Sequence, residues 1–144
     1  MKSKSALALL AMTFGLVACE TTESTGDFSC DVTRSGSTVT LDERLSGSAS
    51  YISKVTAQVD DYGYDYVSVE TELWYANSAY ASEECSERKD DARGWKDGSV
   101  DVTCSGNYIN VYEYDEGSLD DYERDFNRQC EEAYRRYESG DLQL

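Results

Sequence analysis

Six segments of the chain alternate between hydrophobic and polar residues, and this period of two predicts β-strands. They cover residues 28–34, 38–45, 50–59, 66–75, 98–104 and 108–114. Runs of serine and glycine, or a Gly-Asn pair, separate several neighbouring segments, as expected for tight turns. In the last segment Ile109 and Val111 are expected to face the core, which puts the tyrosines of that strand on the opposite side.

Two further segments repeat hydrophobic residues at helical spacing. In the clearer one, Ser118 and Asp121 form a start that resembles a capping box, and Gly140 marks the end. Its hydrophobic face consists of Leu119, Tyr122, Phe126, Cys130, Ala133 and Tyr137. The other segment, residues 78–93, has a thinner stripe. We expect Ser78 to cap it and Gly94 to end it in the left-handed conformation.

The order of elements is therefore four strands, a helix, two strands and a helix. Short connections favour antiparallel neighbours, and both helices need a hydrophobic surface to cover. The sequence predicts a single α+β domain over residues 28–139, with an antiparallel meander sheet of about six strands and two helices packed on one face. A C-terminal tail, residues 140–144, follows.

The first 19 residues have the features of an export signal. Two lysines precede an apolar run, residues 6–17, that is too short to span the ~30 Å of a bilayer core as a helix. The run ends in Leu16-Val17-Ala18-Cys19, which resembles the lipobox of bacterial lipoproteins. The resemblance implies that a signal peptide, residues 1–18, is removed and that Cys19 carries a diacylglycerol. An ordinary signal peptide cut before Cys19 is the alternative.

Residues 19–27 contain no hydrophobic residue after Cys19, and they predict a flexible tether between the lipid and the domain. Two or three acyl chains would hold the protein stably on a membrane. We therefore expect a location in the cell envelope, outside the cytoplasm, on the periplasmic or cell-surface side. Glu20 leaves the choice of membrane open.

The four cysteines that remain after Cys19 are Cys30, Cys85, Cys104 and Cys130. An even number of cysteines in an exported protein predicts two disulfides, and four cysteines allow three pairings. The sequence does not choose among the pairings. A zinc site is disfavoured, because the spacings of 55, 19 and 26 residues contain no Cys-x-x-Cys motif.

Charge and composition exclude several kinds of function. The chain has 29 acidic residues, 13 basic residues and a net charge of −16, which disfavours binding to nucleic acid. It has no histidine, so histidine-based catalytic triads and metal sites are excluded. Carboxylate pairs are so abundant that they do not indicate a glycosidase site. We expect a protein without catalytic activity, metal or cofactor.

Tyrosine is unusually common, with 12 in the chain. Several tyrosines and one tryptophan are expected on the open side of the sheet or in a nearby loop. This candidate binding face comprises Tyr62, Tyr64, Tyr66, Trp74, Tyr108, Tyr112 and Tyr114. Flat aromatic side chains with a hydroxyl group suit the binding of sugars or proteins. The alternative is that they only stabilise the sheet through cross-strand pairs.

The element order behind the lipobox is similar to that of small YehR-like cell-envelope lipoproteins. This resemblance covers most of residues 28–139, although the four cysteines depart from that pattern, and it implies no activity. We expect a lipid-anchored binding or structural module whose partner is an envelope protein or a glycan. The alternative function is a carbohydrate-binding accessory module that uses the exposed tyrosine and tryptophan face.

Overall fold

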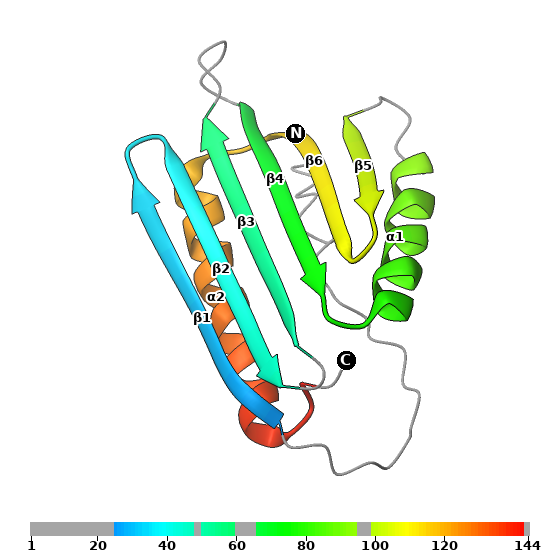
Figure 1. The fold of residues 1–144 in the computed structure, drawn as a ribbon. Helices are drawn as coiled ribbons and strands as arrows, with labels where there is room; N and C mark the ends of the chain where they lie inside the picture. The colour runs from blue at the N-terminus through cyan, green and yellow to red at the C-terminus, as the bar shows by residue number, and fades with distance from the viewer. Residues whose placement is uncertain (1–24, 48–49, 60–65, 95–98, 143–144) are drawn as a thin grey trace.

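The computed structural model describes residues 25–47, 50–59, 66–94 and 99–142, which form one six-stranded antiparallel sheet and two helices (Figure 1). The elements in chain order are β1 (Thr25–Ser35), β2 (Thr38–Gly47), β3 (Tyr51–Val59), β4 (Tyr66–Tyr75), α1 (Ser78–Arg93), β5 (Val100–Ser105), β6 (Tyr108–Glu116) and α2 (Leu119–Ser139). The predicted α+β class and the predicted order of elements are confirmed.

In space the strands follow the order β1-β2-β3-β4-β6-β5. The first four form a meander, whereas α1 carries the chain past one strand position, so that β5 lies at the edge and β6 returns beside β4 (Figure 1). The β5–β6 hairpin turns at Gly106, whose φ of +59° is strained for a residue with a side chain.

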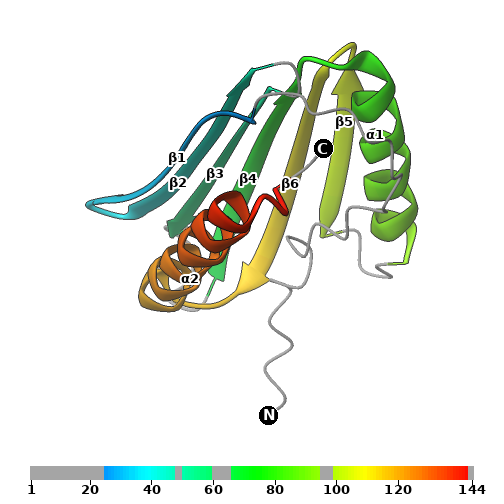
Figure 2. The same ribbon diagram turned by 90° about the horizontal axis from the view of Figure 1, so that it is seen from below.

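Both helices cover the same face of the sheet. The side chains of β4 and β6 that lie beneath them, including Val69, Leu73, Ile109 and Val111, are buried. Helix α2 packs on β1, β2 and β3, while α1 packs on β5, β4 and β6. The helices thus stand at opposite ends of the sheet (Figure 2).

Helix α2 follows its sequence pattern closely. Ser118 caps it by accepting a hydrogen bond from the backbone N–H of Asp121, and Gly140 ends it in the left-handed conformation. Five of the six residues of its predicted hydrophobic face are buried, and Phe126 is 1% exposed. The sixth, Tyr137, is half-buried against the second part of the core.

Helix α1 spans the predicted residues, but its capping differs from the prediction at both ends. Its cap is Asn77, whose side chain accepts hydrogen bonds from the N–H groups of Ala79 and Tyr80, so the prediction of Ser78 was wrong by one residue. Asparagine is at least as good a cap as serine, and two adjacent candidates cannot be separated by type. Gly94 has a φ of −72°, so the expected left-handed end was also wrong.

The domain begins and ends differently from the expected boundaries. Strand β1 starts at Thr25, three residues before residue 28, with a register shift before Phe28. Gly26 fits there because a Cβ atom at this position would lie 1.6 Å from the backbone oxygen of Ser46. Beyond α2, Leu142 is buried in the core, so part of the expected tail belongs to the packed domain. The expected signal peptide and Cys19 lie outside the described residues.

Candidate functional site

Five aromatic side chains gather on the open face of the sheet, over β4 and β6. These residues, which we call the aromatic face, are Tyr66, Trp74, Tyr108, Tyr112 and Tyr114. All but Tyr114 are among the exposed large hydrophobic residues of the domain, with exposed fractions from 37% for Tyr108 to 46% for Tyr112. They face away from the helices because the neighbouring residues in each strand point into the core.

The register of β4 against β6 arranges these rings at the two ends of the strand pair. Trp74 lies opposite Tyr108 at one end. At the other end Tyr66 and Tyr114 stack, with ring centroids 5.3 Å apart and planes within 7° of parallel. Tyr112 lies between these two ends of the strand pair, opposite Glu70. Aromatic pairs of this kind contribute about 0.5–1.5 kcal/mol beyond their burial.

Two carboxylates, Glu70 and Glu72, occupy the middle of the aromatic face. Glu70 accepts a hydrogen bond from the Asn110 amide at 2.8 Å, and Glu72 accepts one from the Tyr108 hydroxyl at 3.2 Å. At the far end the Tyr66 hydroxyl donates to Glu116 at 3.1 Å. Aromatic rings and carboxylates on this surface are therefore held in place by one another.

The structure brings together five of the seven residues of the predicted binding face. Tyr62 and Tyr64 lie outside the described residues. The expectation that Ile109 and Val111 face the core, opposite the tyrosines of β6, is confirmed.

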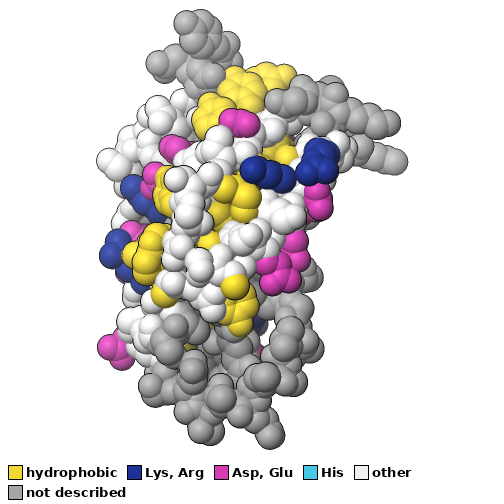
Figure 3. Space-filling view, turned by 45° about the vertical axis from the view of Figure 1, so that its right-hand side comes forward, with side chains coloured by type: hydrophobic (Ala, Val, Ile, Leu, Met, Phe, Trp, Pro, Cys, Tyr) yellow, Lys and Arg dark blue, Asp and Glu magenta, His cyan; other side chains and the backbone are white. Residues whose placement is uncertain are grey.

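Charge is distributed unevenly between the two ends of the sheet. Strands β4, β5 and β6 carry six acidic residues and no lysine or arginine. Strands β1, β2 and β3 carry four acidic and three basic residues. Hydrophobic side chains reach the surface at several places beside acidic ones (Figure 3). The three strands at the aromatic-face end of the sheet are thus acidic, and Lys54 of β3, opposite Glu72, stands at the border of this region.

Beneath strands β4, β6 and β5, helix α1 presents charged groups to the core side of the sheet. Arg88 is 6% exposed, and its Nε donates to Glu84 at 2.7 Å. Glu113 of β6 lies on the same side, and within the described residues its Oε1 has no hydrogen-bond partner. Burial raises the pKa of Glu113 to about 7, with Arg88 opposing the rise and Asp115 adding to it. The sequence pattern of α1 did not indicate that Arg88 is buried, because Glu84 and Arg88 have the same i, i+4 spacing as an ion pair on an exposed helix surface.

A buried carboxyl, that of Glu43 of β2, lies at the end of the sheet where β1 begins. The hydroxyl of Tyr51 donates a hydrogen bond to it. Burial raises the pKa of Glu43, and this outweighs the lowering caused by Tyr51 and Arg136. Because the carboxyl has a hydrogen-bond donor and a nearby cation, it fits a structural role.

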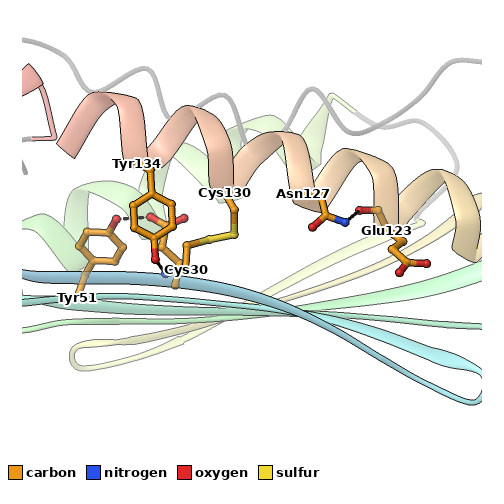
Figure 4. The surroundings of a disulfide bond; sticks show 7 residues. Cys30, Tyr51, Glu123, Asn127, Cys130 and Tyr134 are labelled. Atoms are coloured by element: carbon orange, nitrogen blue, oxygen red, sulfur yellow. Dashed lines mark hydrogen bonds between the residues drawn. A yellow bond between two sulfur atoms is a disulfide. The ribbon is translucent and has the colours of Figure 1, made fainter. Parts of the chain in front are cut away.

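The four cysteines form two disulfides, Cys30–Cys130 and Cys85–Cys104. The first joins β1 to α2, where the Tyr134 hydroxyl accepts a hydrogen bond from the Cys30 N–H (Figure 4). The second joins α1 to β5. The prediction of two bridges is confirmed, and the pairing that the sequence left open is now assigned. Each helix is bonded covalently to an edge strand of the sheet.

Comparison with family models, with curated proteins and with solved structures finds no match for this chain. Neither helix in the described part of the chain is both long and apolar enough to cross a bilayer. Among the residues whose positions are described, no cluster of three or more cysteine, aspartate or glutamate side chains is placed to hold a metal ion. The aromatic face is the strongest candidate site in the described part of the chain.

Proposed function

We propose that this protein is a lipid-anchored binding module of the cell envelope, without catalytic activity, and that it contacts its partner through the aromatic face. The observation that carries this proposal is the set of exposed rings on one strand pair. Isolated exposed hydrophobic residues are ordinary, whereas a group of them on one face is typical of an interaction surface. The two disulfides support export, because such bonds persist in oxidising compartments.

The anchor and the surface are compatible in geometry. If Cys19 carries the lipid, six residue steps separate it from the start of β1 at Thr25, which is a reach of at most about 20 Å. The sheet end where β1 starts is also the end where β4 finishes, at Trp74 and Tyr75 (Figure 1). The Trp74 and Tyr108 end of the aromatic face would then lie nearer the membrane, and the Tyr66 and Tyr114 end farther from it.

The anchor is tested by Cys19→Ala. This variant should lose incorporation of a labelled fatty acid and should move from the detergent phase to the aqueous phase on partitioning. Thr22→Ala is the matched control, because it changes a residue three positions after Cys19 without touching the proposed lipid site or a disulfide. Unchanged detergent partitioning of Cys19→Ala would contradict lipidation.

The surface is tested by site-specific photo-crosslinking in cells. A photoreactive residue at Tyr112 should give a discrete crosslinked product. The same residue at Tyr80, an aromatic position on α1 that is 39% exposed against 46% for Tyr112, should give none. Products from position 80 alone would place the partner on a different surface and would refute the role of the aromatic face.

The second candidate function is a carbohydrate-binding accessory module. It is favoured by flat rings that lie beside carboxylate and amide groups able to bond sugar hydroxyls, such as Glu70 and Asn110. In that case neutral oligosaccharides should change the fluorescence of Trp74, and the change should be absent in Trp74→Phe.

A further inference from the structure

The charge of the aromatic face points to the class of its ligand. On the open side of β4, β6 and β5 the side chains that are charged at neutral pH are the carboxylates of Glu70, Glu72, Asp101 and Glu116. Lys54 of the neighbouring strand β3 lies opposite Glu72. The three strands carry no lysine or arginine to balance them. An anionic ligand would be repelled by such a surface, whereas a cationic ligand would be attracted and oriented.

The positions of the rings fit the same class. Glu70 and Glu72 lie in the middle of the strand pair. Trp74 and Tyr108 lie beyond Glu72 at one end. Tyr112 lies opposite Glu70, and Tyr114 lies beyond it toward the other end. An aromatic ring attracts a cation to its face, and a carboxylate beside it adds a charged acceptor. A carboxylate has about four acceptor positions, so the bonds from Asn110 and Tyr108 leave capacity for donors of a ligand.

The spacing of the two carboxylates suits an extended chain. Residues two apart on one face of a strand are separated by about 7 Å. Alternate side chains of an extended peptide repeat at the same distance. Two lysine or arginine side chains at positions i and i+2 of a bound peptide would therefore meet Glu70 and Glu72 in register.

We propose that the aromatic face binds an extended, lysine- or arginine-bearing segment of another protein. This inference rests on the proposed function and names the partner class for the same surface. The nearest basic residue across the register is Lys54 of β3, opposite Glu72, and it marks the border of the acidic region. On β2, Arg44 is already bound by both oxygens of Asp42.

The test uses a fluorescent peptide of four Lys-Gly repeats, with fluorescence anisotropy measured on the disulfide-bonded protein at low and physiological salt. Trp74→Ala with Tyr112→Ala should weaken binding about tenfold. Glu70→Gln with Glu72→Gln should weaken it by a similar factor. Two controls, Tyr80→Ala and Glu83→Gln with Glu87→Gln on the exposed side of α1, should leave the affinity within about twofold. Near-ultraviolet circular dichroism verifies that each variant is folded.

Three results would overturn the inference. Equal weakening by both pairs of glutamate substitutions, with no effect of removing the rings, would show long-range attraction without a site. A Trp74-dependent response to a neutral hexasaccharide but not to the peptide would keep the binding surface and give it a sugar ligand. No Trp74-dependent response to either probe, together with crosslinks only from position 80, would also refute the proposed function. The salt dependence of binding distinguishes a cationic ligand from a neutral sugar, since a cationic ligand binds more weakly as salt rises.

Discussion

The β1–β2–β3 end of the sheet and the β4–β6–β5 end differ on both of their faces. At the first end α2 lies on a hydrophobic core, and the strands carry nearly balanced charges. At the second end α1 brings Arg88 and Glu84 toward the core, Glu113 lies half-buried on the same side, and rings and carboxylates occupy the open face. The first end also buries a carboxyl, Glu43, but the Tyr51 hydroxyl bonds it, whereas Glu113 Oε1 has no hydrogen-bond partner within the described residues. The second end therefore departs further from the usual rules of stability than the first, and it does so on both faces. Such departures are typical of functional regions.

The largest difference should come from removing one disulfide at a time. In the chain-entropy model, the Cys30–Cys130 bridge closes a loop of 100 residues and the Cys85–Cys104 bridge a loop of 19. Replacing both cysteines by alanine should cost about 5 kcal/mol for the first and about 3 kcal/mol for the second. Denaturant unfolding of the two variants measures the costs. In the variant without the Cys85–Cys104 bridge, hydrogen exchange should become faster in α1 while the amides of α2 stay protected. Equally fast exchange in both helices of that variant would contradict the description of two different ends.

The buried ion pair of α1 gives the next effect. Arg88→Met should lower the free energy of unfolding by about 3 kcal/mol, because Glu84 stays partly buried without its partner. Replacing both residues, by Glu84→Leu with Arg88→Met, should restore most of that stability. A double variant as unstable as the single one would show that α1 needs the charges themselves. Chemical denaturation of both variants decides between these results.

Glu113 makes the stability of the second end depend on pH. Its pKa is raised from 4.5 to about 7, so the folded state holds its proton more tightly than the unfolded state. This contribution is fully present below pH 4.5 and is lost as the pH rises through 7. Glu113→Gln should therefore match the wild type near pH 4 and exceed it at pH 8 by at most about 3 kcal/mol. A constant difference across pH, measured by denaturant unfolding, would contradict the shift. Arg88 and Glu84 on α1, Asp115 on β6 and Tyr122 on α2 also face this region.

The smallest effect concerns the stacked rings of Tyr66 and Tyr114. A double-mutant cycle with alanine at both positions should give a coupling of about 1 kcal/mol in unfolding. This pair would then stabilise the fold as well as form part of the exposed aromatic face. Trp74→Ala should change stability less than it changes binding, since Trp74 is 40% exposed. If every ring of the aromatic face cost several kcal/mol in unfolding and none affected ligand affinity, the face would be structural only.

The same comparison shows what the sequence could predict. The contacts of α2 were predictable, because Leu119, Tyr122 and Phe126 mark a hydrophobic stripe that has one physical explanation. The exposure of Tyr108 and Tyr112 was predictable, because alternation with Ile109 and Val111 leaves them on the other face. These features depend on local periodicity alone.

The second end was harder to predict, because its features depend on contacts between distant segments. Disulfide pairing follows from the return of β6 beside β4, which leaves β5 at the edge next to α1. Local patterns do not encode that order of strands. Arg88 and Glu113 have the sequence signature of surface residues, and only the packed structure reveals that Arg88 is buried and Glu113 half-buried.

The most direct test of the account is a backbone NMR titration of the disulfide-bonded domain with the Lys-Gly peptide and, separately, with a neutral hexasaccharide. The amide shifts caused by the peptide should concentrate on β4, β6 and β5 and should weaken with salt. In Trp74→Ala with Tyr112→Ala they should need about tenfold more peptide to reach the same size. Shifts concentrated on β1, β2 and β3 or on the outer sides of the helices, or no shifts with either ligand, would contradict the assignment of binding to the aromatic face.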